Sequence, residues 1–163
     1  MASKQKIGVL FVCTGNICRS PTAEGIFREL ARQQGLDASL VVDSAGLIGY
    51  HQGEPPDPRS IRTAARHGID LSGQRARKLG FSDFHEFDFL LAMDRGHLKQ
   101  MRGMAPAGTE EKLILFLSFH PSARDMDVPD PYYGGDAGFE KTFHLIREGA
   151  EAFLAHLEKK MRR

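Results

Sequence analysis

Four short apolar runs along the chain predict buried β-strands. The apolar residues in these runs are continuous rather than alternating, which is typical of a parallel sheet covered by helices on both faces. The runs cover residues 7–12, 40–42, 87–93 and 113–117.

Apolar positions at helical spacing predict helices between and after these runs. The first helix has an apolar face around Phe27 and ends before Gly35, the second spans about 58–67 and ends before Gly68, and the longest runs through 139–161. Glycine after the last periodic residue is a common helix stop. The alternation of strand and helix predicts an α/β fold, in which functional residues follow the carboxyl ends of strands.

The segment after the first strand can surround an anion. Ser20 is a good N-cap and Pro21 suits the first helical position, so a helix should begin here. The inward N–H groups of such a loop and the N-terminus of the helix would favour a bound phosphate. The segment reads Cys13-Thr14-Gly15-Asn16-Ile17-Cys18-Arg19-Ser20-Pro21.

Within this segment Gly15 and Asn16 tolerate the left-handed backbone conformation that a tight loop needs. The guanidinium of Arg19 can bond two phosphoryl oxygens at once. The amides, the helix N-terminus and the arginine would favour the thiolate of Cys13. A lone cysteine that ends a buried strand is more often a small apolar residue, but the Gly-Asn turn, the arginine and the Ser-Pro start around Cys13 favour a nucleophile.

This segment resembles the signature loop of the low-molecular-weight protein tyrosine phosphatases, and the likeness extends over nearly the whole chain. The loop near the N-terminus together with a late Asp-Pro motif makes the resemblance specific. The other matching segments are Asp43-Ser44-Ala45-Gly46, Pro55-Pro56-Asp57, His67-Gly68-Ile69, Met93-Asp94 and Asp130-Pro131-Tyr132-Tyr133-Gly134.

The resemblance implies a fold and a domain organisation. We expect three layers, with a four-stranded parallel sheet flanked by helices on both faces, as in flavodoxin-like and phosphotyrosine phosphatase I-like proteins. A single low-molecular-weight phosphatase domain would cover residues 1–163, with 1–5 and 162–163 flexible.

It also implies an enzyme that hydrolyses phosphotyrosine and small aryl phosphates through a cysteinyl-phosphate. Cys13 would be the nucleophile, Arg19 the phosphate clamp and Asp130 the general acid, and such an acid contributes about 10²- to 10⁴-fold. Prolines on both sides of Asp130 restrict its backbone. Asp125 and Asp127 are weaker local candidates.

The remaining site residues follow from the resemblance. Asn16, Ser20 and Ser44 would brace the loop, and a histidine usually joins them where this chain has Gln74. Ser20 could also donate a hydrogen bond to the Cys13 thiolate and make the sulfur a better leaving group. Asp94 would hold Arg19, cap the helix that follows, or do both. The residues expected to bind phosphate are Thr14, Gly15, Asn16, Ile17, Cys18, Arg19 and Ser20.

Cys18 should lie close to Cys13 in the same loop. It packs as a small buried side chain, or it joins Cys13 in a disulfide that protects the nucleophile from irreversible oxidation, or it does both. An apolar entrance for the phenyl ring should also surround the loop, although the two tyrosines beside Asp130 could simply pack on the surface. The expected wall residues are Ile17, Tyr50, His51, Tyr132 and Tyr133.

Composition limits the partners and the location. The chain has 22 basic and 21 acidic residues among 163, which argues against a nucleic-acid or membrane surface. No run approaches the ~20 apolar residues of a membrane span, and no signal peptide is evident. We therefore expect a cytoplasmic protein, and the resemblance implies a signalling enzyme, a monomer or weak dimer, that acts on tyrosine-phosphorylated proteins. No cluster in the sequence has metal-ligand spacing, so we expect a reaction without metal or cofactor.

Three other functions remain as alternatives. A protein arginine phosphatase of the same family typically has threonine where this chain has Ile17. A thioredoxin-coupled arsenate reductase needs two further cysteines, and none follows Cys18. A non-catalytic phosphopeptide-binding module is expected to lack the nucleophile or the acid.

Overall fold

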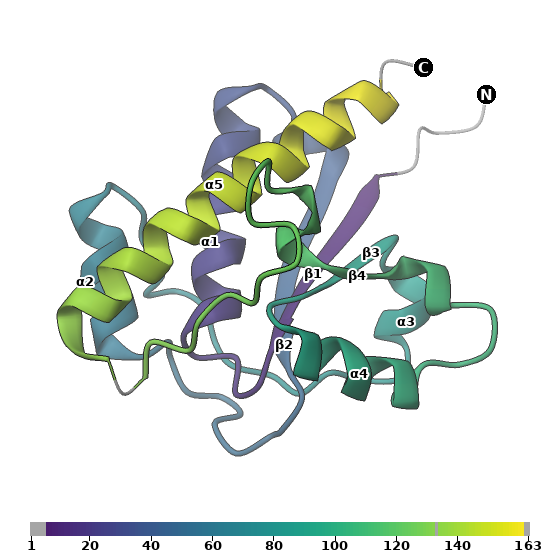
Figure 1. The fold of residues 1–163 in the computed structure, drawn as a ribbon, viewed down its shortest axis with the longest axis horizontal. Helices are drawn as coiled ribbons and strands as arrows, with labels where there is room; N and C mark the ends of the chain where they lie inside the picture. Colours follow the sequence, from purple (N-terminus) through teal and green to yellow (C-terminus); the bar gives the residue numbers. More distant parts are fainter. Residues whose placement is uncertain (1–5, 133, 162–163) are drawn as a thin grey trace.

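A computed structural model describes residues 6–132 and 134–161 of the chain. Its parallel sheet has four strands in the order β2-β1-β3-β4, with helices on both faces (Figure 1). This confirms the predicted fold class. The strands are β1 (Ile7–Cys13), β2 (Leu40–Gly46), β3 (Phe89–Ala92) and β4 (Leu113–Leu115). The helices are α1 (Arg19–Gln33), α2 (Pro58–Arg66), α3 (Asp83–Glu86), α4 (Arg95–Met104) and α5 (Gly135–Met161), with 3₁₀ turns at Asp37–Ser39, Glu110–Lys112 and Phe116–Phe119.

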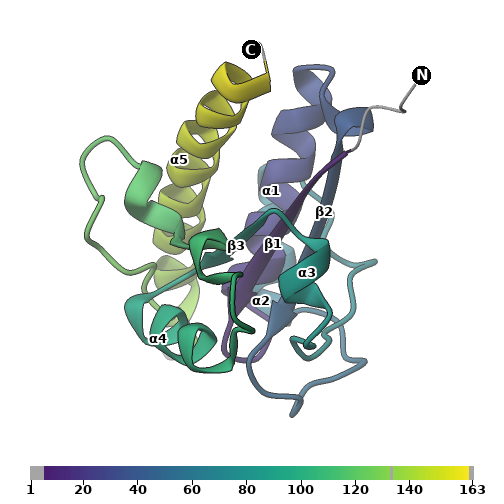
Figure 2. The ribbon, with the colours of Figure 1, turned by 90° about the vertical axis from the view of Figure 1, so that its right-hand side faces the viewer.

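Strand β1 lies at the centre of the sheet and supplies both halves of the core. Val9 and Phe11 point to the face covered by α1 and α5, while Leu10 and Val12 point to the face with α3 and α4. Figure 2 shows these layers from the side. Because both faces are buried, β1 must be apolar at every position, which explains its continuous apolar run.

Three of the predicted strand boundaries change for identifiable reasons. Strand β2 is longer than predicted because it pairs with β1 as far as Gly46, opposite Cys13. Strand β3 begins later because the Phe87 N–H bonds to Asp83 O at the end of α3. Strand β4 ends at Leu115, where the chain turns into a 3₁₀ segment.

The strand order places a ligand site at one edge of the sheet. The chain after β1 leads to α1 on one face, and the chain after β3 leads to α4 on the other, so the crevice between these strand ends is a topological switch point. Cys13 ends β1, and Asp94 follows β3 by two residues. The predicted flexible segments, 1–5 and 162–163, lie outside the described residues. Within the described chain, no helix has the length and apolar character needed to cross a membrane.

Candidate active site

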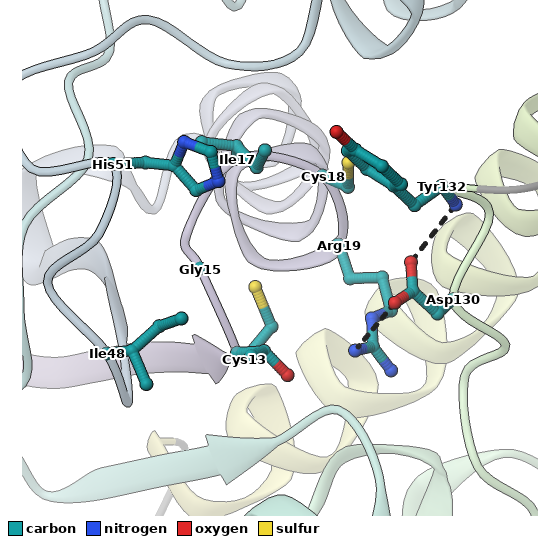
Figure 3. Close-up of a pocket in the computed structure, with 10 residues that line it drawn as sticks. Cys13, Gly15, Ile17, Cys18, Arg19, Ile48, His51, Asp130 and Tyr132 are labelled. Carbon is teal, nitrogen blue, oxygen red and sulfur yellow. Dashed lines mark hydrogen bonds and ion pairs between the residues drawn. The ribbon is translucent and has the colours of Figure 1, made fainter.

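The loop between β1 and α1 curls around the sulfur of Cys13 (Figure 3). Asn16 has a φ of 58°, which asparagine tolerates better than most residues. Gly15 does not have a positive φ, so that part of the prediction was wrong. The position where the loop requires a glycine is instead Gly46 of β2, against which the loop backbone packs. A Cβ atom there would lie 2.9 Å from Thr14 O and 3.0 Å from Asn16 N.

Ser20 faces the sulfur rather than capping the helix. Its hydroxyl lies 3.0 Å from Cys13 Sγ and accepts a hydrogen bond of 2.9 Å from Asn16 Nδ2. Helix α1 begins at Arg19 with Cys18 as N-cap, so the prediction of Ser20 as N-cap was wrong. The reason is that the Ser20 hydroxyl is engaged by Cys13 and Asn16 and is not available to the helix N-terminus.

Asn16 is the centre of the network that braces the loop. Its Nδ2 also donates to Ser44 Oγ at 2.9 Å, and its Oδ1 accepts from the Arg77 N–H at 3.0 Å. Ser44 Oγ in turn donates to Glu24 Oε1 at 2.7 Å. Burial raises the pKa of the Glu24 carboxyl, against the hydrogen bond from Ser44 and the charge of Arg28. The three predicted bracing residues thus lie together, and the sequence reasoning missed Glu24.

Gln74 takes a different place from the one predicted. Its Nε2 donates to Pro21 O at 3.0 Å in the first turn of α1, and its Oε1 is buried without a hydrogen-bond partner. Gln74 therefore supports the helix start and, among the described residues, forms no hydrogen bond with Asn16, Ser20 or Ser44.

Arg19 is held from two sides. Its side chain is 6% exposed and lies 2.9 Å from Asp94 Oδ2, and it donates to Val128 O at 3.0 Å. The other oxygen of Asp94 accepts the His97 N–H at 2.8 Å and caps α4. One carboxylate therefore orients the guanidinium and begins the helix.

His97 is a buried site residue that the sequence reasoning missed. Its Nε2 lies 2.7 Å from Thr14 Oγ1 and 3.4 Å from Arg19 Nη2. Burial, and after it the charge of Arg19, lowers the pKa of His97 to about 4. Since an arginine can only donate, the neutral ring presents Nε2 as the acceptor. His97 lies one helical turn after Asp94, and this spacing could have indicated from the sequence that it lies beside Asp94 at the site.

Asp130 lies across the pocket from Cys13 on the loop before α5. Its Oδ2 is 3.8 Å from Arg19 Nη2, and its side chain is 52% exposed. Its Oδ1 accepts the Tyr132 N–H at 3.1 Å. The local competitor Asp127 is instead held by Arg95 at 3.1 Å. Of the local aspartates, Asp130 is the one that lines the pocket.

These residues surround one pocket of about 270 Å³. Ile17, His51 and Tyr132 are among its walls, as expected, and Ile48 is a wall residue that the sequence reasoning missed. Tyr50 is 81% exposed, and its ring makes a T-shaped contact with the His51 ring instead. Tyr133 lies outside the described residues. The lining residues are Cys13, Thr14, Gly15, Ile17, Cys18, Arg19, Ile48, His51, Asp130 and Tyr132.

The second cysteine of the loop differs from the first. Cys18 is buried and not bonded to Cys13. Burial, and after it the charge of Asp57, raises the pKa of the Cys18 thiol to about 12. Cys18 is therefore a neutral thiol at physiological pH, and a thiol is a poor nucleophile.

Comparisons with known proteins agree with this geometry. The model of the low molecular weight phosphotyrosine protein phosphatase family matches residues 8–163. The low molecular weight protein-tyrosine-phosphatase YfkJ of Bacillus subtilis is 42% identical over 153 residues, which are 94% of this chain and 97% of the relative. The human low molecular weight phosphotyrosine protein phosphatase is 39% identical over 155 residues, 94% of this chain and 98% of the relative.

Solved structures show the same likeness. The crystal structure of YfkJ superposes with a TM-score of 0.91 at 40% identity and covers 98% of this chain and 99% of that chain. A protein tyrosine phosphatase from Entamoeba histolytica superposes with a TM-score of 0.91 at 31% identity, covering 96% and 99%. The chain therefore belongs to the low molecular weight phosphotyrosine protein phosphatase family.

Proposed function

We propose that this chain is a protein tyrosine phosphatase that works through a cysteinyl-phosphate intermediate. The observation that carries the proposal is that Cys13, Arg19 and Asp130 line one pocket with apolar walls. The nucleophile and the acid come from segments far apart in the sequence. Their meeting at the switch point of the sheet is what a phosphoryl-transfer site needs.

In the first step the Cys13 thiolate attacks phosphorus. A sulfur–phosphorus bond forms while the bond to the tyrosyl oxygen breaks, and Asp130 gives that oxygen its proton. Arg19 and the amides of the loop hold the other phosphoryl oxygens. Phosphoryl transfer depends mainly on such positioning and charge stabilisation.

In the second step water replaces the sulfur. Asp130, now a carboxylate, takes a proton from the attacking water, an oxygen–phosphorus bond forms, and the thiolate leaves. The Ser20 hydroxyl, 3.0 Å from the sulfur, stabilises the departing thiolate by a hydrogen bond. Inorganic phosphate is released and both residues return to their starting protonation states.

The pocket walls favour an aryl substrate. Ile17 and Ile48 provide apolar surface, and Tyr132 and His51 provide rings against which a phenyl group can pack. The pocket is slightly smaller than those of drug-sized ligands, which suits one aryl phosphate group. Ile17 also separates this proposal from the arginine phosphatase alternative, in which threonine typically stands at this position.

The decisive experiment compares three proteins on aryl phosphates with good and poor leaving groups. Cys13→Ser should show no turnover yet still bind inorganic phosphate, which also reports that the loop is folded. Asp130→Ala should lose about 10²- to 10⁴-fold on the poor leaving group and much less on the good one. Equal activity of wild type and Cys13→Ser would rule out the proposal. Faster hydrolysis of a phosphoarginine peptide than of the matched phosphotyrosine peptide would favour the alternative.

Several finer expectations belong to this proposal. Substrates are phosphorylated proteins, as the family implies, and phosphotyrosine is the modification we propose. A single phosphatase domain, a cytoplasmic location, a signalling role, and a monomeric or weakly dimeric state stay predictions. A Cys13–Cys18 disulfide under oxidation also stays a prediction, since Cys18 would have to react from a buried thiol.

A further inference from the structure

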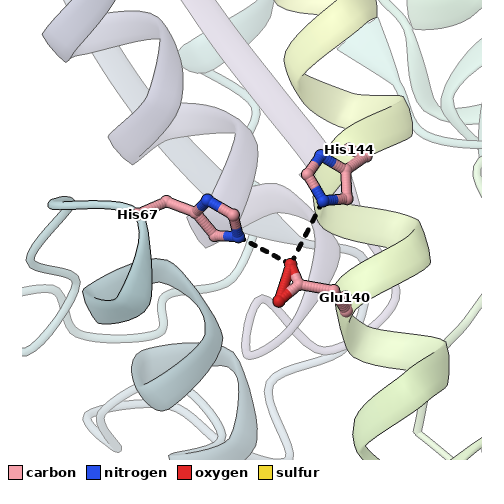
Figure 4. A group of neighbouring side chains, drawn as sticks. All are labelled: His67, Glu140 and His144. Atoms are coloured by element: carbon pink, nitrogen blue, oxygen red, sulfur yellow. Dashed lines mark hydrogen bonds and ion pairs between the residues drawn. The ribbon is translucent and has the colours of Figure 1, made fainter.

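A second group of chemically competent side chains lies away from the pocket, between α2 and α5. His67 is the C-cap residue of α2, and Glu140 and His144 are one turn apart on α5. Figure 4 shows the two imidazole rings directed at the Glu140 carboxylate from the two helices. Among the described residues, this is the group whose geometry could hold a metal ion.

The three donor atoms are already close together. His67 Nε2 lies 2.6 Å from Glu140 Oε2, and His144 Nε2 lies 3.4 Å from the same oxygen. All three atoms lie within 4.8 Å of one another. In a tetrahedral zinc site with bonds of about 2.0–2.1 Å, ligand atoms are about 3.4 Å apart. The pair on α5 has this spacing, and His67 Nε2 would have to move away from Glu140 Oε2 by about 0.8 Å to reach it.

Neighbouring groups hold the ligands in this orientation. The His67 ring stacks on Phe143, with ring centres 4.4 Å apart and planes inclined by 14°. Arg66 Nε lies 3.6 Å from Glu140 Oε1, so the second carboxylate oxygen is occupied and Oε2 faces the histidines. Such outer contacts fix the direction of metal ligands.

We propose that His67, Glu140 and His144 bind a divalent transition metal ion, with Zn²⁺ as the physiological candidate. Two imidazoles and one carboxylate suit zinc and its neighbours, whereas magnesium and calcium prefer oxygen ligands alone. The side chain of His144 is 54% exposed, so the ion can enter from solvent and keep water as a fourth ligand. The ion joins the end of α2 to α5 and does not take part in the reaction at Cys13.

A plain ion pair explains only part of this arrangement. A hydrogen bond between His67 and Glu140 needs no third partner, as the pair of His120 and Glu148 at 3.0 Å illustrates. His144 is the residue that turns a pair into a three-ligand site. The test should therefore remove His144 and leave the pair intact.

The experiment measures Zn²⁺ binding by equilibrium dialysis in the Cys13→Ser background, which removes the thiolate that would compete for zinc. We expect saturable binding, and His144→Gln in the same background should weaken it at least about tenfold, because losing even an outer-shell partner costs about 10- to 100-fold. The matched control is His156→Gln, a histidine elsewhere on α5, which should keep the affinity within about twofold.

A second readout uses the thermal unfolding midpoint, since an ion that binds the folded state raises it. Zn²⁺ should raise the midpoint of the Cys13→Ser protein and of His156→Gln clearly more than that of His144→Gln or Glu140→Gln at the same zinc concentration. Absence of saturable zinc binding, or equal affinity with and without His144, would overturn the proposal. Neither result bears on the phosphatase reaction, because every protein in the test lacks the nucleophile.

Discussion

The phosphate loop and the acid loop lie at the same edge of the sheet but are held in different ways. The loop from Cys13 to Ser20 is braced around the buried side chain of Asn16, which is hydrogen-bonded to the hydroxyls of Ser20 and Ser44 and to the backbone N–H of Arg77. Asp130 instead has a half-exposed side chain that accepts one local backbone N–H and lies 3.8 Å from Arg19. The proposed anion cradle is preorganised, whereas the proposed acid is placed by its loop.

This difference fits the separate demands of the two roles. A cradle for a phosphoryl group must keep its donors fixed, because electrostatic stabilisation depends on dipoles that need no rearrangement. A general acid must meet a departing oxygen and later a water molecule, so it needs access to both. The two loops are joined where Arg19 donates to Val128 O, two residues before Asp130.

The largest effect should come from the cradle. Arg19→Lys removes the planar fork and one of the bonds to Asp94 or Val128, and a lysine can bind the phosphate only as a point charge. We expect kcat/KM on an aryl phosphate to fall about 10³-fold or more. The control is Arg32→Lys on the same helix, an exposed arginine paired with Glu29, which should leave kcat/KM unchanged. A loss below about tenfold would mean that the fork is not required.

The second prediction concerns the buried histidine of the cradle. The pKa of His97 is lowered to about 4 in the folded state, against about 6.5 in an unfolded chain. Between these two pKa values the unfolded state binds a proton at His97 that the folded state does not bind. The free energy of unfolding therefore decreases as pH falls from about 6.5 to about 4. We expect this loss to be on the order of 2 kcal/mol.

His97→Asn should remove this part of the pH dependence. Urea unfolding at several pH values in that window, for wild type and variant, measures the difference between the two slopes. His85→Asn, at an exposed histidine of α3, serves as the control and should keep the wild-type slope. Parallel curves for wild type and His97→Asn would show that the ring is not kept neutral.

The third prediction tests how the acid loop is placed. Arg59 of α2 donates to Tyr132 O at 2.8 Å, bonds Asp57 at 2.9 Å, and lies over the Phe139 ring at 4.6 Å. Arg59→Ala should loosen the loop and lower kcat about tenfold on a poor leaving group, with little change on a good one. Arg62→Ala, one turn away and paired with exposed Asp136 at 3.7 Å, is the control. An equal loss of kcat on both leaving groups would show that Arg59 does not act through the position of Asp130.

The sequence predicted best what depends on local pattern. Continuous apolar runs indicated the strands, since a strand buried on both faces has no polar position. The extension of β2 was missed because Asp43 and Ser44 are polar and interrupt the apolar run: Asp43 pairs with Arg77, and Ser44 bonds Asn16 and Glu24. Ser20 was taken for a helix cap because its local sequence suits one. The other role expected for Ser20, a hydrogen bond to the sulfur of Cys13, is the one for which the structure has the geometry, at 3.0 Å.

What could not be predicted depends on contacts distant in sequence. His97 meets Thr14 across 83 residues, and His67 meets Glu140 across 73, so neither spacing forms a motif. The family resemblance implied roles for Cys13, Arg19 and Asp130, which do line one pocket, but it also placed Tyr50 in the wall, where the structure has Ile48. The loop after β2 was identified correctly. Which of its side chains turns inward depends on packing.

The smallest effect should come from Glu24, the outermost member of the cradle's network. Burial raises the pKa of its carboxyl in the folded state, so the folded state binds a proton more readily than the unfolded state does. This contribution to stability is fully present below about pH 4.5, the ordinary value, and is lost as pH rises through the higher folded pKa. Glu24→Gln keeps an acceptor for the Ser44 hydroxyl and removes the titration.

Relative to wild type, Glu24→Gln should therefore become more stable as pH rises from 4.5 to neutral, measured as the difference in unfolding free energy by urea titration. Its kcat/KM should stay within about threefold, because the cradle needs the geometry of this network and not the charge at its outer end. A large loss of kcat/KM with unchanged stability would mean that the Glu24 charge acts on the phosphate loop through Ser44 and Asn16. The cradle would then depend on a distant charge as well as on preorganised hydrogen bonds. The difference in how the cradle and the acid loop are held would be smaller than the structure indicates.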